Sequence, residues 1–102
     1  MEERHNWQPY NPSWLVALAR DQCPNEPWLS EALQRCTLAR VDRFNIYFVD
    51  NSFPNESGSA WQFDTNIILE DPIEGDIVID VLKDKKIGGI EFLTRASQEG
   101  VE

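Results

Sequence analysis

Hydrophobic and polar residues alternate most regularly in the second half of the chain, and this alternation predicts β-strands. Residues 75–93 have the sequence GDIVIDVLKDKKIGGIEFL, in which two runs rich in β-branched residues flank a short polar turn. Such a pattern is typical of a β-hairpin. In the segment just before this hairpin, apolar or β-branched side chains occupy every second position: Trp61, Phe63, Thr65, Ile67 and Leu69. The period of two predicts another strand, with one face buried and the other facing solvent or a partner.

The first half of the chain predicts two helices and one further strand. Apolar residues recur at helical spacing in Pro12–Gln22, and again in a second helix that we expect Asn25 to cap and Pro27 to open. Cys36 falls on the apolar stripe of this second helix, which predicts a small core residue rather than a nucleophile. Arg43–Asp50 alternates again and predicts a half-buried strand.

Together these elements predict an α+β fold with two N-terminal helices packed on one face of a four-stranded antiparallel meander. A chain of 102 residues corresponds to a single domain. We expect it to comprise an extended arm at 1–11, a helical hairpin at 12–38, the antiparallel sheet at 41–95 and a polar tail at 96–102. Within the last strand, Gly88 and Gly89 predict a β-bulge or a close backbone approach.

The negative charge of the chain is concentrated in one segment. The formal net charge is −9, and eight acidic residues lie between Phe44 and Leu82 with no Lys or Arg among them. Nucleic acids and anionic membranes are disfavoured as partners, because both are bound by cationic residues. A basic protein is the favoured partner, because complementary potentials speed encounter and select partners. The alternative is that the acidic segment only keeps a small protein soluble.

The remaining composition predicts a cytoplasmic protein. No apolar run approaches the roughly 20 residues that a membrane-spanning helix needs, and the first residues, MEERH, are not followed by the apolar segment of a signal peptide. Cys23 and Cys36 are the two cysteines of the chain, and in this context we expect both to be reduced thiols.

No catalytic or metal-binding constellation is recognisable. The single histidine, His5, lies in the predicted arm, so neither a general base near neutral pH nor a zinc site is expected. The acidic turn at residues 71–76 lacks the spacing of a calcium loop. The carboxylate pairs Asp64–Glu70 and Asp80–Glu91 are more typical of a sheet surface than of an acid–base pair. We therefore expect no enzymatic activity and no cofactor.

Residues 79–97, IDVLKDKKIGGIEFLTRAS, resemble the C-terminal hairpin of the small bacterial DUF2283 family, and residues 45–47 resemble its first strand. The family's form is V-D-x-D-x-D-G-x-[IV]-x-G-I-E-[IV]-L-x-A-S. The matching positions are Asp80, Asp84, Ile87, Gly89, Ile90, Glu91, Leu93, Ala96 and Ser97. Lys85 stands where the family usually has a turn glycine, and the two helices have no counterpart. The resemblance implies a hairpin fold but no activity, since that family has no assigned function.

A second resemblance rests on charge, fold class and length and not on a sequence motif. A strongly acidic α+β protein of about 100 residues resembles bacterial immunity proteins, including the partners of colicins and of contact-dependent inhibition effectors. This likeness implies an antitoxin that covers the active or nucleic-acid-binding surface of a basic toxin domain, a nuclease. The predicted partner-binding residues are Asp50, Phe53, Glu56, Trp61, Asp64, Glu70, Asp71, Glu74 and Asp76. Phe53 and Trp61 are the aromatic anchors of this set, although the strand parity of Trp61 also predicts a core position. The alternative is a non-catalytic, DUF2283-like regulatory or scaffolding module.

Overall fold

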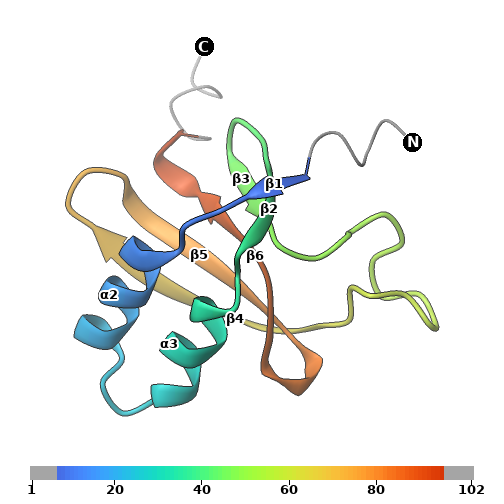
Figure 1. Ribbon diagram of the computed structural model, residues 1–102, viewed down its shortest axis with the longest axis horizontal. Helices are drawn as coiled ribbons and strands as arrows, with labels where there is room; N and C mark the ends of the chain where they lie inside the picture. The colour runs from blue at the N-terminus through green and yellow to red at the C-terminus, as the bar shows by residue number, and fades with distance from the viewer. Residues whose placement is uncertain (1–6, 96–102) are drawn as a thin grey trace.

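A computed structural model describes residues 7–95 of the chain as two layers, one of helices and one of strands (Figure 1). The elements run in the order β1 (Trp7–Pro9), α2 (Ser13–Gln22), α3 (Pro27–Gln34), β2 (Leu38–Val41), β3 (Asn45–Tyr47), β4 (Phe63–Asp71), β5 (Gly75–Leu82), the short 3₁₀ helix η1 (Lys83–Lys85) and β6 (Lys86–Phe92). The strands form one antiparallel sheet of six, and α2 and α3 cover one of its faces. The predicted α+β class is therefore confirmed.

The sheet is larger than predicted, and its order differs. The order is β1-β2-β3-β6-β5-β4, so β4, β5 and β6 form the expected meander. The predicted strand Arg43–Asp50 is shorter, Asn45–Tyr47, and it pairs with β6 instead of β4. Residues 48–62, which connect β3 to β4, are long enough to take the chain to the opposite edge of the sheet. The four-stranded meander was wrong in this respect, because pairing between strands distant in sequence leaves no local pattern.

The N-terminal segments also differ in detail from the expectation. Part of the predicted arm, Trp7–Pro9, is strand β1, which pairs with β2, and β2 begins at the last residue assigned to the helical hairpin, Leu38. Pro27 opens α3 as predicted, but Glu26 and not Asn25 occupies the N-cap position. Residues 1–6 of the arm, with His5, and the predicted tail, with Ala96 and Ser97, lie outside the described residues.

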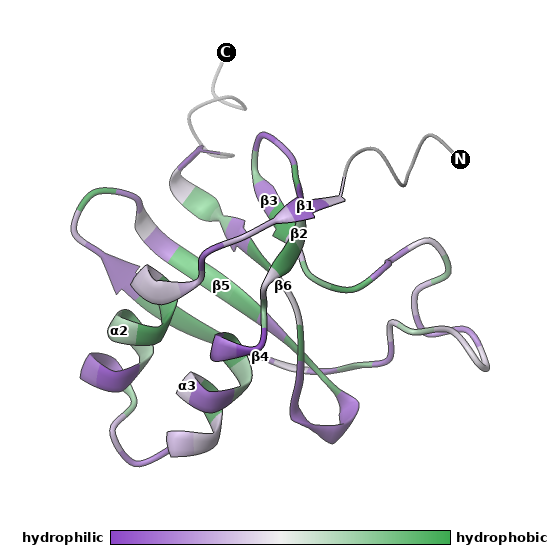
Figure 2. Ribbon diagram, viewed as in Figure 1, coloured by the Kyte–Doolittle hydropathy of each residue, from purple (hydrophilic) through white to green (hydrophobic). Residues whose placement is uncertain are grey.

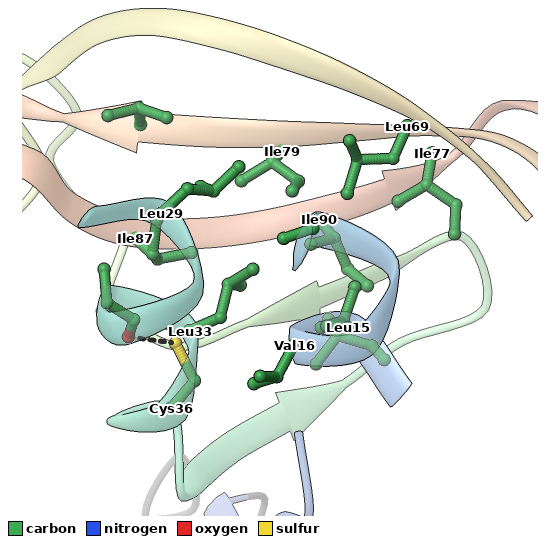
Figure 3. Packing of buried hydrophobic residues seen from close by; sticks show 14 of the residues in the cluster. Leu15, Val16, Leu29, Leu33, Cys36, Leu69, Ile77, Ile79, Ile87 and Ile90 are labelled. Atoms are coloured by element: carbon green, nitrogen blue, oxygen red, sulfur yellow. Dashed lines mark hydrogen bonds between the residues drawn. The ribbon is translucent and has the colours of Figure 1, made fainter. Parts of the chain in front are cut away.

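The main core lies between the helices and the sheet (Figure 3). Leu15 of α2 and Leu33 of α3 have no exposed surface, and they face Ile79 and Ile90 in the sheet. Burying a side chain of this size stabilises a fold by roughly 1.5–3 kcal/mol. The Cys36 thiol donates a hydrogen bond to the Ala32 carbonyl at 3.6 Å, and burial raises its pKa to about 12. Cys36 is therefore a core residue, as its position on the apolar stripe predicted.

The β5–β6 hairpin has the predicted form. Figure 2 shows a mostly hydrophobic β5 and a hydrophilic tip at η1. The register shifts where Asp80 pairs with Gly89 and Val81 with Ile87, which confirms the bulge expected at Gly88. A Cβ atom on Gly89 would lie 2.6 Å from the Ile46 carbonyl oxygen, so this position also has the predicted close backbone approach.

Candidate functional site

The candidate site is the sheet face that the helices leave uncovered, over β4, β5 and β6. The register aligns Ile68, Val78 and Glu91 in one row across the three strands, and Glu70 with Asp76 in the next. Directly paired residues of an antiparallel sheet point to the same side. Ile77 and its alternate neighbours face the core, so these rows face away from it. The surface, called the acidic face below, comprises Asn66, Ile68, Glu70, Asp76, Val78, Asp80 and Glu91.

The acidic face combines an apolar patch on β4 and β5 with carboxylates on three neighbouring strands. Ile68 is 60% exposed, and its partner Val78 is half-buried beside it. Neither β4 nor β5 contains a Lys or Arg residue that could neutralise the surrounding acids. An apolar patch rimmed by polar groups is the usual composition of a protein-binding surface. The arrangement therefore suits a partner that offers both apolar and cationic side chains.

The fold disfavours the charged form of Asp80. Partial burial raises the pKa of its carboxyl group, the hydrogen bond from Asn66 lowers it, and the nearby charge of Glu91 raises it again. The Asn66 Nδ2 donates to Asp80 Oδ1 at a long 3.4 Å. A cation brought by a partner would favour the charged form that this environment disfavours.

The other end of the same sheet face is covered by the chain itself. Residues 48–62 return over it and place Trp61 against Gly88, where a Cβ atom would lie 2.8 Å from the indole ring. The ring of Tyr47 meets Trp61 edge-on at 6.3 Å. Trp61 is only 8% exposed, so the structure places this predicted anchor in the interior and not on a binding surface. The strand parity had indicated a buried position, although the contacts of Trp61 are on the face opposite the helices.

The remaining predicted residues fall into two groups. Phe53, which is 63% exposed, lies on the long loop with Asp50 and Glu56. The Asp50 carboxylate is engaged locally, since Oδ1 accepts hydrogen bonds from the backbone N–H and the hydroxyl of Ser52. This loop group shares no strand with the acidic face.

The second group lies on or beside β4. Glu70 and Asp76 are cross-strand partners within the acidic face, and Asp64 is exposed at the register shift near the start of β4. The Asp71 carboxylate is engaged within the β4–β5 turn. Asp71 Oδ2 accepts hydrogen bonds from two backbone N–H groups of that turn, each at 2.9 Å.

Glu74 is paired with a cation of the chain itself, Arg95. Its two carboxylate oxygens accept hydrogen bonds from Arg95, at 2.9 Å from Nε and 2.7 Å from Nη2. The Arg95 guanidinium also lies 3.9 Å from the centre of the Phe92 ring. A bidentate ion pair of this kind leaves little net charge for a partner. Glu74 is therefore engaged with Arg95 within the chain.

The predicted partner-binding set contained Glu70 and Asp76 of this face and omitted its other members, Asn66, Ile68, Val78, Asp80 and Glu91. A usable signal was present, since Asp76, Val78 and Asp80 share one parity of β5. The cross-strand position of Glu91, however, follows from the register of β6. A hollow of about 470 Å³ continues the acidic surface around the end of β4, with Asp21 of α2 in its lining.

The two carboxylate pairs named from the sequence have different separations in the structure. Asp64 and Glu70 lie six positions apart on one strand, which corresponds to about 20 Å. Asp80 pairs with Gly89 and Glu91 with Val78, so the two acids are diagonal neighbours. Within residues 7–95, no three His, Cys, Asp or Glu side chains gather closely enough to hold a metal ion. In the same part of the chain no helix is long and apolar enough to cross a membrane.

Comparison of the chain with models of protein families, with curated proteins and with solved structures found no significant match.

Proposed function

We propose that this protein is a non-catalytic, cytoplasmic binding protein that uses its acidic face to hold a basic protein domain. We further propose that this partner is a toxin, a nuclease, and that binding neutralises it in the manner of a bacterial immunity protein. The observation that carries the proposal is the acidic face itself: carboxylates of three adjacent strands lie beside the exposed Ile68, and β4 and β5 contain no base.

Electrostatics favours this class of partner. A nuclease binds phosphate through a cationic surface, and a row of carboxylates can occupy that surface in place of nucleic acid. The strands hold neighbouring acids at fixed spacing, so Glu70 and Asp76 need little ordering when they bind. Ile68 and Val78 supply the apolar contact that carries affinity once water is excluded.

The proposal is tested by recovery and inhibition of the partner. The tagged protein is incubated with a lysate of its native organism at low salt, and the eluate obtained at high salt is identified by mass spectrometry. We expect one basic domain, which is then purified and assayed for nucleic-acid cleavage with and without the protein. Association is expected to slow steeply as ionic strength rises.

Matched charge reversals locate the binding surface. Glu70→Lys with Asp76→Lys changes two exposed positions of the acidic face, whereas Glu56→Lys with Asp50→Lys makes the same change on the long loop. We expect the first pair to slow association on the order of tenfold or more and the second pair to have a much smaller effect. Equal association by wild type and the Glu70/Asp76 double variant would refute the assignment of the acidic face.

The second candidate function is a DUF2283-like scaffolding module, which the Gly89-Ile90-Glu91 segment of β6 favours. Here the acidity would serve solubility alone. This alternative is distinguished by a partner that is not basic and whose binding changes little with salt.

A further inference from the structure

Besides the acidic face, the outer edge of β4 is an unusual feature of the sheet. β4 is the last strand of the sheet, and it pairs only with β5 (Figure 1). The backbone N–H and C=O of Glu70 both point away from β5, as their hydrogen bonds to the side-chain amide of Gln22 show. Gln22 Oε1 accepts from the Glu70 N–H at 2.8 Å, and Gln22 Nε2 donates to the Glu70 carbonyl at 2.6 Å. The Gln22 amide thus imitates one residue of a neighbouring strand.

The alternation of hydrogen bonds then defines which other residues of β4 direct their backbone N–H and C=O groups away from β5. In an antiparallel pair, every second residue directs both backbone groups away from its partner strand. Ile68 and Asn66 lie two and four positions before Glu70, without a register shift between them, so their backbone groups also point outward. Among residues 7–95 no hydrogen-bond partner holds these groups. At the start of the strand, Asn55 Oδ1 accepts the Phe63 N–H at 2.9 Å, so the open edge lies between two side-chain caps.

Open edges of this kind are normally blunted. Lysine, proline or a covering segment usually prevents another strand from adding to the sheet. Over Thr65–Leu69 the edge carries no charged residue and no proline, and Ile68 is 60% exposed. A short partner strand can therefore hydrogen-bond to both groups of Asn66 and of Ile68 and cover the Ile68 side chain.

We propose that β4 accepts an extended, basic segment of the partner as a seventh strand of the sheet. This inference rests on the proposed function and specifies how the same partner is held. Strand addition obtains affinity from main-chain hydrogen bonds and specificity from alternate side chains. On the side of the acidic face, a residue opposite Ile68 meets an apolar surface, and the residue two positions away, opposite Asn66, approaches Asp80. In the other direction the Gln22 amide already holds the backbone groups of Glu70, so the added strand ends there and meets the Glu70 carboxylate through a side chain alone. The expected recognition pattern is therefore basic, any, aliphatic, any, basic, with the last residue beside Gln22.

A second copy of this chain is a poorer occupant of the edge. Each copy carries a formal charge of −9, and antiparallel pairing of two β4 strands centred on Ile67 would set Asp64 of one copy opposite Glu70 of the other. Like charges directly opposite one another destabilise a sheet. Charge complementarity thus selects a basic strand over self-association.

A synthetic peptide tests the proposal without changing the protein. The probe has seven residues in which lysine, valine and lysine occupy alternate positions, separated by threonine. A control peptide of the same sequence carries N-methyl groups on its internal backbone nitrogens, which keeps its charge and side chains but removes its backbone donors. Binding is followed by NMR and by hydrogen exchange of the backbone amides. We expect new protection at Asn66 and Ile68 and, for the N-methylated peptide, binding weaker on the order of tenfold.

The outcomes separate this inference from the proposed function. Equal binding of the two peptides, or no binding of either, would overturn strand addition and leave the partner assay with the Glu70/Asp76 reversal to decide the proposed function. Protection at Asn66 and Ile68 that rises with protein concentration alone would also overturn it, in favour of a second copy. Selective protection by the unmethylated peptide, lost when glutamate replaces its lysines, supports a basic strand at this edge.

Discussion

The packing of Trp61 against the sheet gives the sharpest test of how the face opposite the helices is built. Gly88 in β6 lacks a side chain where the indole ring lies closest, and a Cβ atom there would be 2.8 Å from Cη2 and Cζ3 of Trp61. Ordinary carbon–carbon contacts are about 3.5–4.0 Å. The substitution Gly88→Ala must therefore displace the ring or the strand.

The expected loss of stability follows from two opposing contributions. Overpacking of this kind costs about 1–3 kcal/mol. Replacing a glycine also restricts the unfolded chain, which returns about 0.4–1 kcal/mol where the backbone conformation is compatible. We expect Gly88→Ala to lower the free energy of unfolding by about 1–2 kcal/mol, measured in urea as a midpoint shift of roughly 0.5–1 M.

A double-mutant cycle identifies the contact responsible. Trp61→Phe removes the ring atoms nearest to Gly88, so Gly88→Ala should cost much less in that background. A coupling of about 1 kcal/mol is expected, whereas independent sites add within about 0.3–0.5 kcal/mol. Additive effects would refute the proposed clash. Gly89→Ala provides a comparison, because its Cβ would meet the backbone oxygen of Ile46 at 2.6 Å and cannot be accommodated by a ring movement.

Two further predictions concern titratable groups. Burial raises the pKa of the Cys36 thiol to about 12, so at pH 8 a thiol reagent should modify the more exposed Cys23 first and Cys36 only after unfolding; equal rates in the folded protein would contradict this assignment. The pKa of Asp80 is raised in the folded state by burial and by Glu91, so stability falls as pH rises above the unfolded pKa of about 3.9 and through the folded value. Asp80→Asn should therefore be more stable than wild type in urea at pH 7, with a smaller difference at pH 3, and an equal difference at both would exclude this cause.

Local pattern was sufficient for the elements with strong periodicity. The two helices, the β5–β6 hairpin and the β4 strand follow from spacing that their own residues contain, and Pro27 and Gly88 mark a helix start and a bulge. The acidity of β4 and β5 is likewise a property of the sequence.

Only the tertiary structure decided how these elements meet. The pairing of β3 with β6 joins residues more than forty positions apart, and no local pattern specifies such a register. The β5–β6 register puts Glu91 beside Val78, while the backbone of the β4–β5 turn engages the Asp71 carboxylate and Arg95 engages that of Glu74.

The outer edge of β4 shows most clearly what local sequence determines and what tertiary packing determines. Alternation along the sequence determined that β4 is a strand with two different faces. That this strand is the last of the sheet, and that Gln22 holds the groups of Glu70 from 48 positions away, depends on how the whole chain packs. Periodicity depends on a residue's near neighbours in the chain, whereas exposure and pairing depend on residues brought together by burial of the common core.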